Sequence, residues 1–327
     1  MKNKQRREEE TPLGNTLYIV VPCYNEEEVL RETTFRLGEK LLSLGRQGHI
    51  SEDSRVLFVD DGSRDATWEI ITQLHGGDKR FSGLKLTRNK GHQNALLAGL
   101  LLAKERADAV ISMDADLQDD IGAVDDMLGA WREGSDIVYG VRGDRSTDTA
   151  FKRGTAQLFY RLMGWLGVNM VYNHADYRLM SKRALEGLAE FREANLFLRG
   201  IVPLVGYKSS TVTYQRGERF AGESKYPLHK MLSFAWDGIT SFSIRPIRMI
   251  TVLGFVIFAV AIAFTVYSVV AKFLGITVQG WSALMASIWM LGGLQVLALG
   301  IIGEYIGKIY SEVKARPKYL IEQLLDD

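Results

Sequence analysis

The sequence has 327 residues, of which 46% are hydrophobic and 24% are charged, a length that suits one globular domain with an additional region. Its 40 Lys and Arg residues nearly balance 39 Asp and Glu residues, which argues against a nucleic-acid-binding protein and against a strongly acidic partner. Cys23 is the single cysteine, so an intrachain disulfide is excluded and we expect a buried structural thiol.

The N-terminal two thirds of the chain have the pattern of an α/β domain. Residues 1–14 are expected to be a polar tail, because Met1–Glu10 lacks the apolar core of a signal peptide. Between residues 15 and 226, β-rich runs alternate with amphipathic helical stretches, which predicts a mainly parallel sheet covered by helices. The expected strands are Leu17–Val21, Arg55–Val59, Gly83–Leu86, Ala109–Met113 and Asp136–Val141, and the expected helices are Glu26–Leu44, Gln93–Arg106 and Val124–Arg132.

Two polar loops follow the first two predicted strands. Pro22–Glu26 follows the first strand and Asp60–Ser63 follows the second, so both are expected at the edge of the sheet where ligands bind. Carboxylates there can accept hydrogen bonds from ribose hydroxyls and from a base N–H group. Turn chemistry is the alternative interpretation, because Asp-Gly and Asn are common turn residues and Asp65 is a good helix cap.

A pair of carboxylates follows the fourth predicted strand. The segment is Asp114-Ala115-Asp116-Leu117-Gln118. Because side chains two positions apart on a strand point the same way, Asp114 and Asp116 are expected to converge. Adjacent hard oxygen ligands suit Mg²⁺ or Mn²⁺ carrying a diphosphate. The same spacing also occurs by chance in many proteins.

The C-terminal third is predicted to contain membrane segments. Residues 227–248 have the pattern of an amphipathic helix, which would lie in the membrane interface or pack on the sheet domain. Met249–Ala271 and Trp281–Gly303 each run for about 23 uncharged residues, enough to cross a hydrocarbon core of about 30 Å. We therefore expect two transmembrane helices within residues 249–303.

The flanking charges predict how these spans are oriented. Arg245 and Arg248 precede the first span, and four basic residues follow the second: Lys308, Lys314, Arg316 and Lys318. The connection Lys272–Gly280 between the spans has one lysine. Because basic flanks remain inside the cell, both termini are expected to be cytoplasmic. Residues 304–327 would then form a cytoplasmic C-terminal tail of a two-span plasma-membrane protein.

Five motifs in this order resemble glycosyltransferase family 2. They are Pro22–Glu26, Asp60–Ser63, Arg88–His92, Asp114–Gln118 and Arg219–Tyr226, and the match covers essentially the whole chain. The resemblance is to the polyprenyl-phosphate glycosyltransferase branch, which includes dolichol-phosphate mannose synthases and bactoprenol glucosyltransferases. The two C-terminal spans are more similar to the bactoprenol type.

The resemblance implies a GT-A, Rossmann-like domain with a nucleotide site and a metal site. It implies that the nucleotide is bound by Pro22, Tyr24, Glu26, Asp60, Asp61 and Asp114. It implies that Mg²⁺ or Mn²⁺ is bound by Asp114, Asp116 and Gln118, with Asp116 also counted as catalytic.

The same resemblance implies a site for the acceptor phosphate. Arg219, Ser224 and Lys225 match the loop that binds phosphate groups, and an Arg fork, a Lys charge and a Ser hydroxyl suit that role. The resemblance also implies that Arg219 and Lys225 are catalytic. A basic loop that only contacts anionic lipids is the alternative. Arg142 and Arg145 lie in a segment similar to the acceptor-side loop, and Asp176 and Arg178 match a position taken as the catalytic carboxylate and its neighbour. A plain Asp–Arg ion pair is the alternative for that last pair.

The expected reaction is transfer of a sugar from a nucleotide sugar to a polyprenyl phosphate at the cytoplasmic membrane face, with inversion. UDP and glucose are favoured through the bactoprenol resemblance, which also suggests self-association into a homo-oligomer. A processive polysaccharide synthase is one alternative, although such enzymes have a Gln-x-x-Arg-Trp signature and here Gln215 and Arg216 are adjacent. A membrane sugar-nucleotide sensor without turnover is the other.

Overall fold

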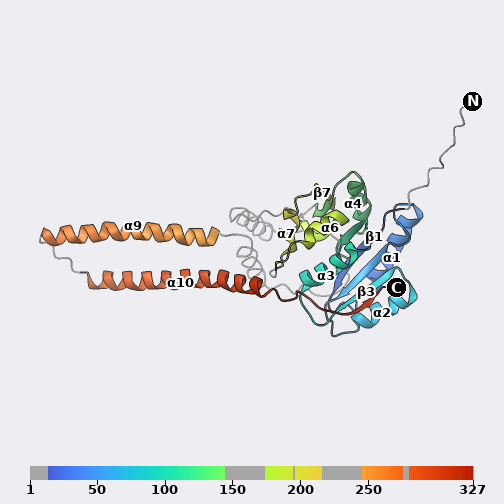
Figure 1. Cartoon of the computed structure of the whole chain (residues 1–327), viewed down its shortest axis with the longest axis horizontal. Helices are drawn as coiled ribbons and strands as arrows, with labels where there is room; N and C mark the ends of the chain where they lie inside the picture. The colour runs from blue at the N-terminus through green and yellow to red at the C-terminus, as the bar shows by residue number, and fades with distance from the viewer. Residues whose placement is uncertain (1–13, 144–173, 194–195, 216–244, 275–279, 327) are drawn as a thin grey trace, which may run out of the picture. The chain divides into compact units, whose positions relative to one another are not determined.

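The computed structural model describes residues 14–143, 174–193, 196–215, 245–274 and 280–326. The chain forms two compact units, shown in Figure 1. The first comprises residues 1–154, 171–225 and 317–327, and the second comprises residues 155–170 and 226–316.

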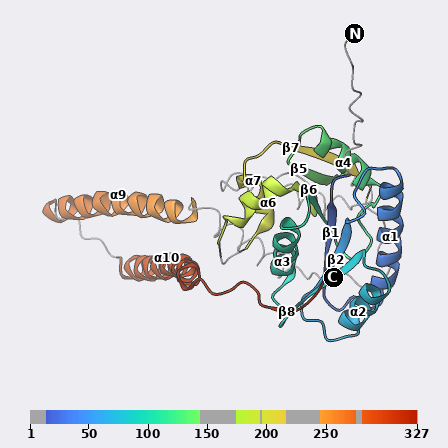
Figure 2. The same ribbon diagram turned by 45° about the vertical axis from the view of Figure 1, so that its right-hand side comes forward.

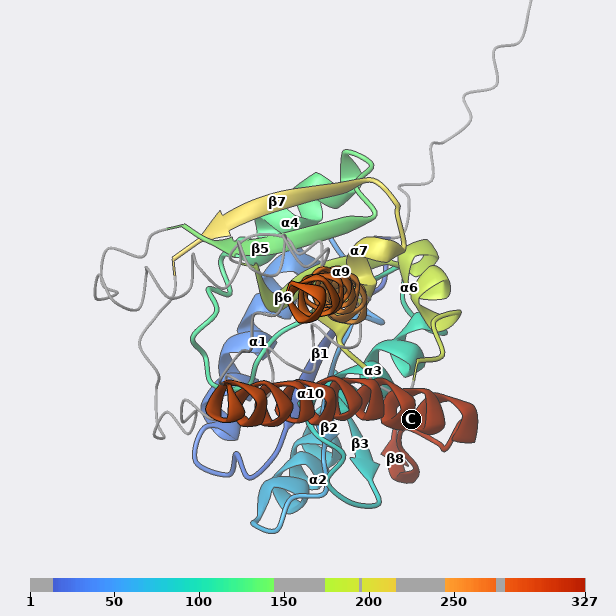
Figure 3. The same ribbon diagram turned by 90° about the vertical axis from the view of Figure 1, so that its left-hand side faces the viewer.

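The first unit is built on an eight-stranded sheet with the order β7-β5-β6-β4-β1-β2-β3-β8. Its strands are β1 Leu17–Cys23, β2 Arg55–Asp60, β3 Phe81–Leu86, β4 Ala109–Ser112, β5 Ile137–Arg142, β6 His174–Ser181, β7 Ser209–Tyr214 and β8 Ile321–Leu325. Strands β4, β1, β2 and β3 are parallel, whereas β6 and β8 run antiparallel to their neighbours. Figure 3 shows β7 at one edge of this sheet and β8 near the other.

Helices cover both faces of the parallel strands, as Figure 2 shows for α1 and α3. Alternate residues of the strands, such as Ile19 and Phe58, pack in one cluster with α1 (Leu30–Arg46), α2 (Thr67–Gly77) and α4 (Ala123–Arg132). The opposite face packs against α3 (His92–Lys104), where a Cβ atom at Gly99 would lie 2.4 Å from the Val20 side chain. This burial on both faces explains the nearly continuous apolar strands.

The predicted α/β fold with a mostly parallel sheet is confirmed. The five predicted strands and three predicted helices are present, with α1 beginning at Leu30 rather than at Glu26. The start of α1 is later because the backbone N–H of Glu27 donates to Asp65 and its carboxylate accepts from Ala66 N–H. The sequence analysis did not identify α2, β6, α6 (Lys182–Ala189), α7 (Leu198–Leu204), β7 or β8.

Strand β8 lies within the residues that the sequence analysis assigned to a C-terminal tail. It pairs antiparallel with β3, and the Thr87 N–H donates to the Leu320 carbonyl (3.0 Å). At its other end the buried carboxylate of Asp326 accepts from Ser82 Oγ (3.2 Å) and pairs with Arg55 (3.4 Å). The last residues of the chain therefore cover an edge of the sheet that would otherwise be open.

The described part of the second unit consists of two long helices. Helix α9 (Arg245–Phe273) contains the first predicted span and α10 (Trp281–Lys314) contains the second. Large apolar side chains such as Phe255 and Met290 are exposed on them. Among the described residues, one helical stretch is long and apolar enough to cross a membrane, Met290–Lys314 with a mean hydropathy of 1.5. The two-span arrangement stays a prediction, and the predicted interfacial helix 227–248 lies mostly outside the described residues.

Candidate active site

One carboxylate holds the loop after β2 against the loop after β3. Asp61 accepts hydrogen bonds from the backbone N–H groups of Lys90 (2.7 Å) and Gly91 (2.8 Å). Gly62 has a φ of +67°, and a Cβ atom there would lie 2.7 Å from the backbone carbon of Arg88. Glycine is required for this close approach and this backbone conformation. The loop after β2 and the loop after β3 are therefore held together as one structure.

Asp60 is fully buried at the end of β2. Its Oδ1 accepts from the Ser63 N–H (3.1 Å), whereas Oδ2 has no hydrogen-bond partner within the described part of the chain. Burial raises the pKa of Asp60 and of Asp61 above the ordinary value for aspartate. A buried polar oxygen without a donor is unfavourable, and a hydroxyl or N–H group of a nucleoside would supply that donor.

The loop after β1 contacts the loop after β2. The Asn25 N–H donates to Ser63 Oγ (3.0 Å), and Asn25 Oδ1 accepts from the Arg64 N–H (2.9 Å). Asn25 has a φ of +54°, which asparagine tolerates better than most residues. The residues predicted to line a nucleoside pocket differ in exposure here: Pro22 is buried, Tyr24 is exposed and Glu26 is half-buried.

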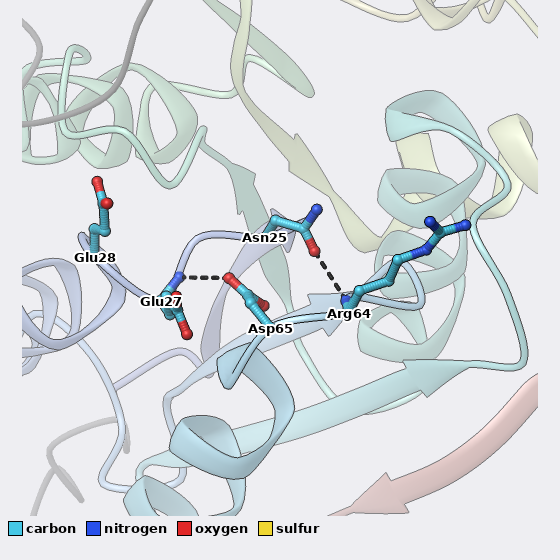
Figure 4. A pocket seen from close by; sticks show the side chains of 5 residues that line it. All are labelled: Asn25, Glu27, Glu28, Arg64 and Asp65. Carbon is cyan, nitrogen blue, oxygen red and sulfur yellow. Dashed lines mark hydrogen bonds between the residues drawn. The ribbon is translucent and has the colours of Figure 1, made fainter.

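A polar pocket of about 300 Å³ lies beside these loops, and Figure 4 shows the side chains around it. It is lined by Asn25, Glu27, Glu28, Arg64 and Asp65. The Glu27 N–H donates to Asp65 (3.2 Å), and both residues belong to the hydrogen bonds that join the start of α1 to the start of α2. The sequence analysis named Asp65 only as a helix cap.

The predicted metal ligands lie in the loop after β4. This strand ends at Ser112, so the strand alternation invoked for Asp114 and Asp116 is wrong: both residues follow the strand. Their arrangement comes from a turn, in which Asp116 Oδ1 accepts from the Gln118 N–H (3.1 Å) and Leu117 has a φ of +58°.

The charges around this loop favour a cation. Burial and the neighbouring carboxylates of Asp176 and Asp116 raise the pKa of Asp114, and His92 opposes that increase. Carboxylates that repel one another in this way suit a divalent ion, which would neutralise them. Within the described ranges, no cluster of three or more His, Cys, Asp or Glu side chains could hold a metal ion. Asp114, Asp116 and Gln118 are the oxygen-bearing side chains of this loop that could hold such a cation.

Asp176 is a buried carboxylate held by two arginines. Its Oδ1 accepts from Arg178 Nη2 (2.6 Å) and Arg199 Nε (3.2 Å), and its Oδ2 accepts from Arg199 Nη2 (3.0 Å). Burial alone would raise the pKa of Asp176, but the Arg199 and Arg178 charges lower it well below the ordinary value. Asp176 is therefore an ionised carboxylate at neutral pH. Arg178 is fully buried and contacts Asp176, as the ion-pair alternative expects.

His92 begins α3 and lies between two carboxylates. Its Nε2 is 3.6 Å from Asp114 Oδ1 and 3.8 Å from Asp176 Oδ2. Ser112 Oγ donates to the backbone carbonyl of Asp176 (2.5 Å), which fixes β6 beside the end of β4. Side chains from α3, the loop after β4 and β6 therefore converge on one site.

Asp119 links the loop after β4 to β7. Its Oδ1 accepts from Tyr214 Oη (2.5 Å), while Oδ2 is buried without a partner among the described residues. Burial, together with Asp114, raises the pKa of Asp119 to about 6, and Arg142 opposes this. Of the predicted acceptor residues, Arg142 thus lies near Asp119 and Tyr214, at the end of β5.

Four predicted site residues lie outside the described residues: Arg145, Arg219, Ser224 and Lys225. Three other residues that the sequence analysis did not assign to the site are described: His92, Asp119 and Arg199. His92 is the last residue of the motif Arg88–His92 and Asp119 follows the motif Asp114–Gln118, so both had a usable signal. Arg199 lies in a short helix far from every motif, so no local pattern indicated it.

Comparisons with known proteins identify the family. Residues 18–188 match the family Glycosyl transferase family 2. The Bacillus subtilis (strain 168) protein named uncharacterized glycosyltransferase YkoT is 58% identical over 94% of this chain and 91% of its own length. The prophage bactoprenol glucosyl transferase homolog of Escherichia coli (strain K12) is 40% identical over 94% of this chain and 98% of its own length. A crystal structure of glucosyl-3-phosphoglycerate synthase from Mycobacterium tuberculosis is 21% identical, with a TM-score of 0.44 over 69% of this chain and 77% of that chain. The chain belongs to glycosyl transferase family 2 and is a glycosyltransferase.

Proposed function

We propose that this protein transfers a sugar from a nucleotide sugar to a polyprenyl phosphate at the cytoplasmic face of the plasma membrane. The observation that carries the proposal is the 40% identity over 94% of the chain to a protein named bactoprenol glucosyl transferase homolog. That relative's name supports a lipid phosphate as acceptor and glucose as the sugar. The carboxylates of Asp114 and Asp116 and the guanidinium of Arg142, all in the described part of the chain, support the proposal.

The nucleotide would bind to the loops after β1 and β2. Asp60 offers an oxygen that has no donor among the described residues, and Asp61 holds the neighbouring loop in place. Pro22, Tyr24 and Glu26 would complete the nucleoside site. UDP is the nucleotide we favour, through the relation to bactoprenol glucosyl transferases.

The diphosphate would lie beside the loop after β4. Asp114, Asp116 and Gln118 would hold Mg²⁺ or Mn²⁺, which when bound would neutralise charge on the departing diphosphate. The lipid phosphate oxygen would attack the anomeric carbon as the bond to the diphosphate breaks, which inverts that carbon. A phosphomonoester has a second pKa of about 6 and is therefore already anionic at neutral pH. A strong general base is unnecessary, consistent with an ionised, arginine-bound Asp176.

The acceptor phosphate would be bound by basic side chains. Arg142 lies at the end of β5 near Asp119, and Arg145, Arg219, Ser224 and Lys225 are proposed as its partners. Arg178 is fully buried against Asp176, so we assign it to holding Asp176 rather than to direct contact with the lipid.

The membrane would be crossed twice, by α9 and α10. Strand β8 follows α10 in the chain and pairs with β3, which precedes α9. Two strands of one sheet lie on the same side of a membrane, so the chain between them must cross an even number of times. A single crossing by Met290–Lys314 alone is incompatible with that pairing. Two spans with both termini in the cytoplasm are the arrangement that we propose, and self-association would occur through these helices.

The test is to incubate the purified protein with undecaprenyl phosphate and a panel of nucleotide sugars. We expect lipid-linked sugar and nucleoside diphosphate in equal amounts. A processive synthase would instead give a growing polymer, and a sensor would bind a nucleotide sugar without releasing nucleoside diphosphate. Either result would overturn the proposal.

The metal site has its own prediction. Asp116→Ala should abolish transfer while keeping the melting temperature, because a lost ligand removes charge neutralisation from the diphosphate. Asp126→Ala, an exposed aspartate on α4, is the matched control and should keep wild-type turnover. Wild-type turnover of Asp116→Ala in chelator-treated buffer would contradict the metal assignment.

A further inference from the structure

The contact between Arg199 and Asp176 is a feature of this site to which the proposed reaction assigns no role. Arg199 donates to both oxygens of Asp176, at 3.2 Å from Nε and 3.0 Å from Nη2. The side chain of Asp176 is 8% exposed and that of Arg199 is 34% exposed. Arg199 is thus the solvent-facing member of the pair.

The geometry makes Asp176 unsuitable as a general base. Both oxygens already accept charge-assisted hydrogen bonds, which stabilise the ionised form that would have to take up a proton. Among the described residues, Oδ2 accepts a hydrogen bond from Arg199 and lies 3.8 Å from His92 Nε2, so this oxygen retains capacity for another donor. Asp176 is therefore suited to accepting hydrogen bonds rather than protons.

A purely structural role explains Arg178 better than Arg199. Arg178 is fully buried and already supplies a counter-charge to Asp176 at 2.6 Å. A second, partly exposed arginine adds little stability as an ion pair. The charge of Arg199 also lowers the pKa of Asp114, so Arg199 lies within electrostatic range of the loop after β4.

We propose that Asp176 and Arg199 bind hydroxyl groups of the transferred sugar and set which sugar is accepted. Sugar hydroxyls both donate and accept hydrogen bonds, and a carboxylate beside a guanidinium offers both partners in fixed positions. A diphosphate would favour an arginine whose charge is not already offset by a bidentate aspartate. The inference rests on the proposed function, because it assumes a nucleotide-sugar donor.

The experiment compares binding of UDP-glucose, UDP-galactose, UDP-N-acetylglucosamine and UDP by titration calorimetry with Mn²⁺. The wild-type protein should bind UDP-glucose more tightly than UDP. Arg199→Lys and Asp176→Asn should weaken UDP-glucose binding by about tenfold to 100-fold, on the scale of a lost charged hydrogen bond. They should leave UDP affinity unchanged and narrow the differences among the three sugars.

Arg183→Lys is the matched control, because Arg183 pairs with Asp136 at the start of β5, away from the carboxyl ends of the strands. Arg183→Lys should change neither the affinity for UDP-glucose nor the affinity for UDP. If Arg199→Lys lowers the melting temperature, Arg199→Gln, which keeps two donors, replaces it.

Four results would overturn the inference. Equal losses of affinity for UDP and UDP-glucose in the Arg199 variant would make Arg199 a phosphate ligand. Unchanged affinities in both variants would exclude contact with the sugar. A wild-type protein that binds UDP and UDP-glucose with the same affinity would exclude it as well. Loss of turnover in Asp176→Asn with unchanged UDP-glucose affinity would make Asp176 a base. Failure of the proposed function is seen separately, as a wild type that binds UDP-glucose but does not glycosylate undecaprenyl phosphate.

Discussion

At the scale of single residues, Asp119 is the buried carboxylate with the clearest energetic consequence. Its pKa is raised to about 6 in the folded protein, chiefly by burial. A carboxyl group with a raised pKa stabilises the folded state fully below its unfolded pKa of about 4. That stabilisation is lost as the pH rises through about 6. Above this pH the ionised group depends on its hydrogen bond from Tyr214.

Tyr214→Phe should therefore destabilise the protein more at pH 7.5 than at pH 4.5. Removing the donor leaves a buried, ionised oxygen unsatisfied, which costs about 1–3 kcal/mol. Thermal unfolding in detergent at the two pH values measures this. Tyr177→Phe is the control, because Tyr177 Oη donates to the uncharged backbone carbonyl of Asp120 (2.9 Å). A pH-independent loss in Tyr214→Phe, like that expected for Tyr177→Phe, would contradict the argument.

The carboxylates that the sequence placed at this edge of the sheet are those that end or follow a recognisable strand. Asp60, Asp61 and Asp114 could be assigned to one edge from strand order alone. Arg199 could not, because it is brought to Asp176 by tertiary packing between distant segments. The alternation argument for Asp114 and Asp116 failed because a turn, not the strand, carries them.

At the scale of elements, α3 packs on the sheet through a glycine. A Cβ atom at Gly99 would lie 2.4 Å from Val20 and 2.7 Å from Val59, so Gly99→Ala should destabilise the fold by about 1–3 kcal/mol through overpacking. At Gly129 in α4 a Cβ atom meets nothing within 4 Å, so Gly129→Ala should stabilise the helix by up to about 1 kcal/mol. Melting temperatures that move in the same direction for both variants would refute this contrast.

The C-terminal strand offers a second test at this scale. Asp326 is buried and faces Arg55, Arg106 and Ser82. Asp326→Ala should lower stability by about 1–3 kcal/mol, because partly buried cations lose their counter-charge.

Glu322→Gln is the control for that change, since Glu322 is an exposed residue that pairs with the partly exposed Lys85 (3.5 Å). This substitution should cost less than about 1 kcal/mol. Thermal unfolding of both variants decides the matter. Equal losses of stability in the two variants would mean that Asp326 does not stabilise the pairing of β8 with the sheet.

Strands between Leu17 and Arg142 could be predicted because helices cover both faces of the sheet there and make the strands apolar throughout. Strand β7 alternates between exposed and partly buried residues, and β8 is mostly exposed. Such polar edge strands carry little pattern. Their pairing with β5 and β3 joins segments that are remote in the sequence, which no local signal reveals.

At the scale of the whole molecule, the pairing of β8 with β3 constrains the course of the chain through a membrane. Both strands belong to one sheet, so the intervening helices must return the chain to the side from which it left. Basic residues on both outer flanks favour the cytoplasm as that side. The connection between α9 and α10 would then face the opposite side.

Reporters that fluoresce only in the cytoplasm test this arrangement. Fusions before Met1 and after Asp327 should both be fluorescent, because the sheet that contains β3 and β8 must stay undivided. A reporter inserted at residues 275–279 should be dark if α9 and α10 both cross. Fluorescence at all three positions would mean that neither helix crosses, and a dark fusion at one terminus alone would mean an odd number of crossings. The second result would require β8 to leave β3, so it would contradict the sheet as well as the proposed membrane topology.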